Sequence, residues 1–179
     1  MKNARAQVAV SLSASLQTKV ITRAKLPAID SSLSNSLVIY DRKLIRAFPA
    51  LKKWLQHCGQ IYPVTAGEQL KSIETFPHHI TKLLKKADQL SRDKLQVVAI
   101  GGGSVLDFAG FIASTLKRGV QFVSIPSTWL AAVDAAHGGK TALNVAAIKN
   151  QLGTFYNAKK IYLLKDLLFA QPEKLANQA

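Results

Sequence analysis

Short hydrophobic runs alternate along this 179-residue chain with segments of helical periodicity. The runs that read as strands are 36–40 (SLVIY), 60–64 (QIYPV), 95–100 (LQVVAI), 120–126 (VQFVSIP) and 159–164 (KKIYLL). LQVVAI is continuously apolar, which is typical of a strand buried on both faces of a parallel sheet. Strands that alternate with helices predict βαβ units, so the expected fold class is α/β, a Rossmann-like doubly wound parallel sheet.

Three segments between these runs have apolar residues at helical spacing. The first predicted helix ends at Gly59, and the third ends at Gly119. The second follows Glu68, and we expect Pro77 to divide it. The apolar faces are Leu44, Phe48, Leu51 and Leu55 in the first; Ile80, Leu83, Leu84, Ala87 and Leu90 in the second; and Val105, Phe108, Ala109, Ile112 and Leu116 in the third.

The remaining segments follow other patterns. Residues 6–12 and 18–23 predict an N-terminal β-hairpin region, because strand-like alternation is found there. Residues 127–136 predict a short helix, and 140–157 read as a loop. A further helix is expected to begin near the end of the chain, with Pro172 in its first turn.

Composition narrows the class of protein. No stretch approaches about 18 continuous apolar residues, so we expect no membrane span. The first residues are too polar for a secretory signal, and a cytoplasmic protein is the default. Cys58 is the single cysteine, which excludes a disulfide framework and a cysteine-based metal site. The net charge of +14 is spread over several helices, which favours anionic substrates or acidic partners over nucleic acid.

The turn after LQVVAI has the composition of a phosphate site. Gly101, Gly102, Gly103 and Ser104 join the strand to a helix, where glycines allow close approach and the first helical N–H groups favour an anion. The G-x-G-x-x-G fingerprint is incomplete because Leu106 occupies the third glycine position, so a plain strand–helix turn stays an alternative. Asp107 follows in the first turn, where it either caps the helix dipole or faces a ligand.

A second polar segment, 134–150, contains the GKT of a P-loop at 139–141. A P-loop needs glycine five residues before Gly139, and Asp134 occupies that position, so we reject a P-loop. The segment instead suits a small polyhydroxylated anion, since lysine neutralises a carboxylate or phosphate while Asp and Asn hold hydroxyls. An exposed polar loop is the alternative. Its polar side chains are Asp134, His137, Lys140, Asn144, Lys149 and Asn150.

Several ordered motifs between about 36 and 175 resemble the 3-dehydroquinate synthases and related sugar-phosphate cyclases. They are YDRK, AGEQLKSIET, VVAIGGGSVLDFAGFIASTLKRGVQFVSIPSTWLAAVDAAHGGKTALN and KNQLGTFYNAKKIYLL. The resemblance implies a lyase of the shikimate pathway of aromatic amino acid biosynthesis. Its reaction is NAD- and zinc-dependent phosphate elimination and cyclisation of a seven-carbon keto-acid phosphate.

The resemblance also implies roles for individual residues. Asp41, Glu68 and Lys71 would hold the adenosine side of NAD, Gly102 and Gly103 its pyrophosphate, and Ser127 and Thr128 the nicotinamide region. Gly101, Ser104 and Asp107 would also bind the cofactor. Asp134, Lys140, Asn144, Lys149 and Asn150 would line the sugar-phosphate pocket. Arg118 resembles an arginine that reaches a neighbouring subunit, which implies a dimer.

The zinc ligands of the family, a Glu and two His, belong to a helical C-terminal domain. The four histidines here lack a zinc-ligand spacing, so we predict no metal site and place zinc on another segment or chain. We expect an NAD-binding domain over 1–166 and the start of a truncated helical domain over 167–179. Expected partners are a sugar-phosphate-like anion and either a second copy or a separate zinc-bearing chain. The alternative function is a non-catalytic nucleotide- or anion-binding domain, and the resemblance assigns no role to His137.

Overall fold

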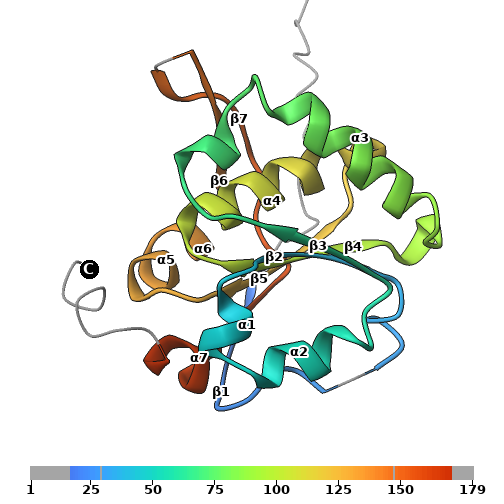
Figure 1. Ribbon diagram of the computed structural model, residues 1–179, viewed down its shortest axis with the longest axis vertical. Coiled ribbons are helices and arrows are strands. Elements are labelled where there is room, and N and C mark those ends of the chain that lie inside the picture. Colours follow the sequence, from blue (N-terminus) through green and yellow to red (C-terminus); the bar gives the residue numbers. More distant parts are fainter. Residues whose placement is uncertain (1–16, 29, 147, 171–179) are drawn as a thin grey trace, which may run out of the picture.

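The computed structural model describes residues 17–28, 30–146 and 148–170. Its centre is a six-stranded parallel sheet in the order β1-β8-β5-β4-β2-β3 (Figure 1). The strands are β1 (Lys19–Arg23), β2 (Ser36–Asp41), β3 (Gln60–Val64), β4 (Gln96–Gly101), β5 (Gln121–Pro126) and β8 (Lys160–Leu164). The doubly wound α/β class and all five strand runs predicted from the sequence are confirmed.

Helices cover both faces of this sheet (Figure 1). On one face lie η1 (Glu68–Lys71), α3 (Phe76–Ala87), α4 (Gly103–Thr115), η3 (Leu116–Arg118), α5 (Trp129–Val133) and α6 (Ala135–Gly138). On the other lie α1 (Leu44–Ala47), α2 (Ala50–Leu55) and α7 (Lys165–Phe169). In β4 the side chains of Val97 and Ala99 enter the first core, and those of Val98 and Ile100 enter the second. This alternation explains why the strand is apolar throughout.

Two predicted helices differ from the structure. The first is divided into α1 and α2 at Phe48–Pro49, because Pro49 disfavours the helical conformation of the residue before it and Phe48 has φ −137° and ψ 78°. In the second, the break expected at Pro77 is wrong: the chain leaves the helical path at Ser72, and Pro77 lies in the first turn of α3. Proline is tolerated there because the first helical N–H groups have no intrahelical acceptor.

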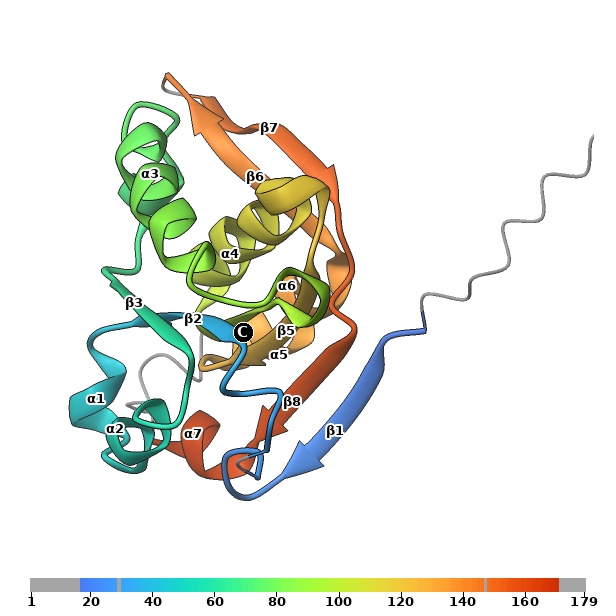
Figure 2. The same cartoon turned by 90° about the vertical axis from the view of Figure 1, so that its right-hand side faces the viewer.

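The loop expected over 140–157 is largely a β-hairpin. Its strands are β6 (Lys140–Val145) and β7 (Ile148–Phe155), which pair antiparallel and lie along α4 (Figure 2). Thr141 and Leu143 are buried on the side of α4, so β6 has the period of a strand. The Thr141 hydroxyl lies 2.9 Å from that of Thr154. Because this inward-facing residue is polar, the sequence of β6 does not show the alternation of apolar and polar residues that predicts a strand.

The two ends of the described chain meet the predictions only in part. The segment 18–23 forms β1, which pairs in parallel with β8 and not with a hairpin partner (Figure 2). The other predicted hairpin strand, 6–12, and the helix expected at Pro172 lie outside the described residues. The domain boundary at 166 stays a prediction; α7 spans it, and Leu167 belongs to the second core.

The strand order reverses between β2 and β4. The connection from β2 to β3 runs through α1 and α2 on one face, whereas β4 and β5 are joined through α4 on the other. Ligands of open α/β sheets bind at such a switch point, beside the carboxyl ends of the strands. Here those ends are Asp41 and Gly101, and the site is expected beside them.

Candidate functional site

A pocket of about 910 Å³ opens at the carboxyl end of the sheet, between the start of α4, η1, α5 and the β6–β7 hairpin. This volume is in the range of small-molecule and cofactor sites. Nine of the sequence-predicted residues line it: Glu68, Lys71, Gly103, Ser104, Asp107, Thr128, Asp134, Lys140 and Asn150. The structure therefore brings both proposed groups, cofactor-side and substrate-side, to one cavity.

The glycine turn forms one wall of this pocket. Gly101 is buried and could carry no side chain, since a Cβ there would lie 2.6 Å from Cβ of Val105. At Gly103 the nearest atom to a Cβ would be Cβ of Ala135 at 3.8 Å, an ordinary van der Waals distance, and Gly103 lines the pocket at the start of α4. The Gly67 N–H donates to Ser104 Oγ over 3.0 Å, which joins the loop before η1 to this turn. The result is an accessible helix start with the geometry of an anion site.

Lys71 is the centre of the polar contacts in the pocket. Its side chain is 5% exposed, and Nζ donates to Asp107 Oδ2 over 2.7 Å and to Asn150 Oδ1 over 2.6 Å. Burial raises the pKa of the Asp107 carboxyl, and the hydrogen bond and positive charge of Lys71 oppose this only in part. A buried amine held between a carboxylate and an amide is a preorganised donor for an incoming polar ligand.

Asn144 links the hairpin to η1. Its Nδ2 donates to Glu68 Oε2 over 2.8 Å, and its Oδ1 accepts from the Asn150 N–H over 2.9 Å. The backbone of Asn150 has φ 55°, a left-handed conformation that Asn tolerates better than most residues. Asn144 is buried and lies behind the pocket wall, so it positions the residues of the wall.

The other predicted site residues lie around this centre. Asp41 is buried at the end of β2 and accepts from the Lys43 N–H over 3.1 Å. Ser127 is buried, and its N–H donates to the Gly101 carbonyl over 2.9 Å, which ties the ends of β4 and β5. Lys149 is exposed on β7. Arg118 is exposed beyond the other end of α4, about 20 Å along the helix from the pocket, and does not join it.

The structure also places GKT. Gly139 has φ 60°, and Lys140 begins strand β6, whereas a P-loop lysine begins a helix. The rejection of a P-loop is confirmed. Lys140 is exposed and lines the pocket.

Several lining residues had no assigned role in the sequence. Gly67, with φ 139°, lines the pocket. It lies in the motif AGEQLKSIET, which could have identified it as a site residue from the sequence. Leu130 and Phe155 are 52% and 84% exposed and form an apolar rim. Phe155 was hidden because its segment read as a loop.

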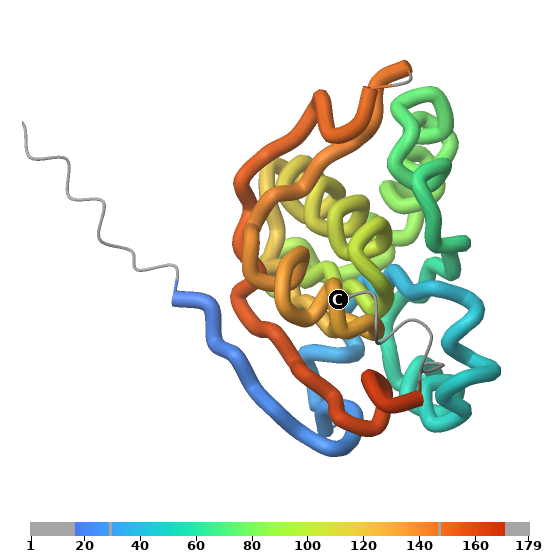
Figure 3. Tube along the Cα trace, turned by 90° about the vertical axis from the view of Figure 1, so that its left-hand side faces the viewer, coloured from blue at the N-terminus to red at the C-terminus, as the bar shows by residue number. Residues whose placement is uncertain are grey.

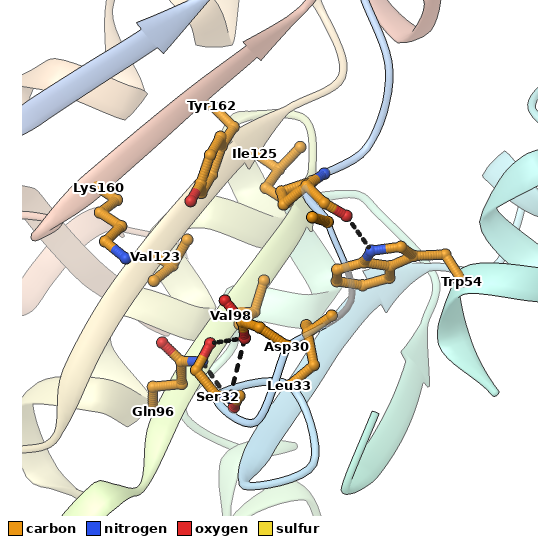
Figure 4. A pocket seen from close by; sticks show the side chains of 12 residues that line it. Asp30, Ser32, Leu33, Trp54, Gln96, Val98, Val123, Ile125, Lys160 and Tyr162 are labelled. Atoms are coloured by element: carbon orange, nitrogen blue, oxygen red, sulfur yellow. Dashed lines mark hydrogen bonds between the residues drawn. The ribbon is translucent and has the colours of Figure 1, made fainter. Parts of the chain in front are cut away.

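A second hollow lies on the opposite face of the sheet (Figure 4). It is bounded by Trp54, Tyr162, Val123 and Gln96, and Trp54 Nε1 donates to the Pro27 carbonyl over 3.0 Å. Its volume of about 30 Å³ has room for roughly one or two water molecules. It is too small for a nucleotide or sugar phosphate.

The described residues contain neither a cluster of metal ligands nor a helix that could span a membrane. Within 17–28, 30–146 and 148–170, no three of His, Cys, Asp and Glu gather as a metal site. Over the same ranges, no helix is long and apolar enough to cross a bilayer.

Comparisons with known proteins identify the family of the chain. Residues 61–178 match the family described as 3-dehydroquinate synthase N-terminal. A 3-dehydroquinate synthase from Idiomarina loihiensis is 35% identical over 176 residues, which are 94% of this chain and 48% of that protein. One from Clostridium perfringens is 41% identical over 118 residues, or 66% and 33%. The chain thus spans about half, or less, of the length of these curated relatives.

Solved structures show the same fold. The 2-epi-5-epi-valiolone synthase from Streptomyces hygroscopicus, with NAD+ and Zn2+ bound, has a TM-score of 0.68 and 27% identity over 83% of this chain and 43% of its own. An iron-containing alcohol dehydrogenase from Thermotoga maritima shares the fold at 19% identity, with a TM-score of 0.61 over 88% and 49%. The chain therefore belongs to the 3-dehydroquinate synthase N-terminal family.

Proposed function

We propose that this chain supplies the NAD-binding half, and part of the substrate pocket, of a 3-dehydroquinate synthase-like enzyme. The observation that carries the proposal is the Lys71–Asp107–Asn150 contact. It joins the helix of the glycine turn to the hairpin across one pocket of about 910 Å³. The family match and the NAD+ in the valiolone synthase support it.

The described residues fit NAD. Gly103 leaves the start of α4 open, so the first N–H groups of the helix can donate to a pyrophosphate. Asp41, at the end of β2 beside β4, would accept a hydrogen bond from an adenosine ribose hydroxyl. When bound, NAD accepts and returns a hydride. The chain's own contribution is to bind and orient it beside Lys71 and Thr128.

The substrate side of the pocket suits a seven-carbon keto-acid phosphate. Lys140 would neutralise its phosphate or carboxylate, and Lys149, exposed on β7, would assist from the rim. Asp134 and Asn150 would accept from and donate to hydroxyl groups.

Zinc does not fit the described residues, because no three suitable ligands lie together there. We assign no step through zinc to this chain and place its ligands on another segment or a partner chain. The proposed assembly is a homodimer or a pair with a zinc-bearing chain, in the cytoplasm. Arg118, exposed at the far end of α4, would serve a neighbouring subunit's pocket.

NAD binding tests this proposal most directly. Calorimetric titration should detect NAD, and Gly103→Asp should abolish the signal because the new carboxylate would repel the pyrophosphate. The substitution has room, since the nearest atom to a Cβ is 3.8 Å away, so the fold should persist by circular dichroism. Gln121→Glu, which adds the same charge at an exposed position at the start of β5, is the matched control. A folded wild-type chain that binds no NAD would contradict the proposal.

The alternative is a non-catalytic nucleotide- or anion-binding domain, favoured by the lack of a zinc site within the described residues. Phosphate release from the keto-acid phosphate separates the two. An enzyme half should release phosphate only after a zinc-bearing C-terminal half is added, and Lys140→Met should remove that activity. NAD binding without release under those conditions supports the alternative.

A further inference from the structure

A groove of about 560 Å³ is lined by residues of β3, one of the two edge strands of the sheet, and of α3. Figure 2 shows where these two elements lie. Two contacts show that α3 runs antiparallel to β3. Tyr62 Oη and His79 Nδ1 are 2.8 Å apart, and farther along the helix Lys86 Nζ donates to Gln60 Oε1 over 3.2 Å. We call this hollow the β3–α3 groove.

The β3–α3 groove is basic. Arg42, His78, Lys82 and Lys86 line it, and none of its lining residues is acidic. Within the described ranges the ion pairs are Lys71–Asp107 and Lys117–Asp88, so none of these lysines or Arg42 has a carboxylate partner within 4.0 Å. Cations gathered without counter-ions repel one another, and a bound anion relieves that repulsion.

The basic side chains are arranged in a line. His78, Lys82 and Lys86 are spaced four residues apart and share one side of α3, at intervals of about 6 Å along the helix axis. Arg42 lies at the carboxyl end of β2, the strand that pairs with β3. A line of basic groups about 12 Å long suits an elongated ligand with several negative groups better than a single small ion.

Two features argue against other occupants. The Val64 carbonyl accepts from the Arg42 N–H beside β2, so its neighbour Pro63 turns its backbone nitrogen to the open edge. Proline has no N–H to donate there, which disfavours an added peptide strand. The aromatic ring of Tyr62 is buried, and His79 meets it edge-on, so the groove offers no exposed tyrosine face for nucleobase stacking.

The groove is separate from the pocket proposed for NAD. The two share no lining residue, and η1 forms the wall between them: Glu68 and Lys71 line the pocket, whereas Gln69 lines the groove. We propose that the β3–α3 groove binds a short linear polyphosphate, a small molecule with two or more phosphate groups in line.

Inorganic tripolyphosphate is the probe, titrated into the full chain by calorimetry at low and at physiological salt. We expect saturable binding that weakens about tenfold or more in Lys82→Gln/Lys86→Gln, because two charge-assisted contacts are lost. The control Lys85→Gln/Lys94→Gln removes the same charge from exposed positions outside the groove. It should change the affinity by less than about threefold, as expected for long-range screening alone.

The same variants separate this proposal from NAD binding. Lys82→Gln/Lys86→Gln should bind NAD normally, and Gly103→Asp should bind tripolyphosphate normally. No tripolyphosphate binding, or equal weakening in the control pair, would overturn the proposal. Displacement of tripolyphosphate by NAD would move the site to the large pocket. Tighter, groove-dependent binding of single-stranded DNA would replace it with a nucleic-acid site.

Discussion

At the scale of single residues, Lys71 determines how the pocket is held. A buried amine must be paired, and this one contacts a carboxylate on α4 and an amide on β7. The pairing of Lys71 with Asp107 offsets only part of the effect of burial on the carboxylate, since the pKa of the Asp107 carboxyl is still raised. The pocket thus contains a carboxylate that folding makes harder to ionise, next to its sole described ion-pair partner.

Replacement of Lys71 should make the free energy of unfolding depend more strongly on pH, through the buried Asp107 carboxyl. Folding raises the pKa of the Asp107 carboxyl above its unfolded value of about 3.8. The protonated carboxyl therefore contributes its full stability below pH 3.8, and this contribution is lost as the pH rises through the pKa of the folded state. Lys71→Met removes the group that opposes the shift. Between about pH 4 and pH 7, the free energy of unfolding measured in urea should therefore fall more for Lys71→Met than for the wild type.

Lys117→Met provides the comparison, because its partner Asp88 is 68% exposed. A surface pair of this kind contributes little, so the pH profile of this variant should follow the wild type. Matching profiles for Lys71→Met and Lys117→Met would show that Asp107 is not held as described.

Cys58 offers a second test at this scale. Burial raises the pKa of its thiol to about 11 from 9.0, against a hydrogen bond with Ser36. At pH 8 the thiolate is therefore about a hundredfold scarcer than in the unfolded chain. Alkylation by iodoacetamide, followed by mass spectrometry, should be about that much slower in buffer than in urea and should accelerate as pH rises. Equal rates in the two solvents would refute the assigned environment.

At the scale of elements, the continuous apolar strands and the α4 periodicity made most of the sheet predictable from sequence. The hairpin was not predictable in the same way. Polar Thr141 faces inward, and β7 is exposed along most of its length, so neither strand has a clear apolar face. The division of the first predicted helix was readable from Pro49, but the position of the break near Pro77 depended on tertiary contacts of Ser72 and Ile73 with Asn144.

The packing of the hairpin on α4 gives a stability prediction. At Gly110 a Cβ would lie 2.3 Å from Thr141 Cγ2, so the helix and β6 touch because glycine is there. Alanine improves helix propensity by about 1 kcal/mol, yet Gly110→Ala should destabilise the fold by about 1–3 kcal/mol through overpacking. Urea denaturation gives the free energy of unfolding of Gly110→Ala and of the double variant Gly110→Ala/Thr141→Ser.

Thr141→Ser removes that methyl group and keeps the hydroxyl. The double variant Gly110→Ala/Thr141→Ser should recover part of the lost stability, so that the two effects are not additive. If the two stability changes were strictly additive, the Thr141 methyl group would not be the group that a Cβ at position 110 displaces.

At the scale of the whole molecule, the sequence allowed the site residues to be named but not their connections. The resemblance placed Glu68 and Lys71 with the cofactor and Asn144 and Asn150 with the substrate. The structure joins these two groups by direct hydrogen bonds. Such contacts depend on the left-handed turn at Asn150 and the path of η1, which leave no periodic signal in the sequence. Arg118 remains a prediction, because its proposed contact is with another subunit.

The parallel pairing of β1 with β8 also bears on how the molecule folds (Figure 3). Lys19 lies opposite Lys160, so this contact closes a loop of about 140 residues, whereas β2, β3 and β4 meet within much shorter spans. Closure of so long a loop carries the largest chain-entropy cost in the sheet. β1 lies at the edge, and most of its side chains are exposed, so little buried surface offsets that cost. We therefore expect β1 to be the last of the described strands to dock and the first to detach, while the pocket at the β2–β4 switch point stays assembled.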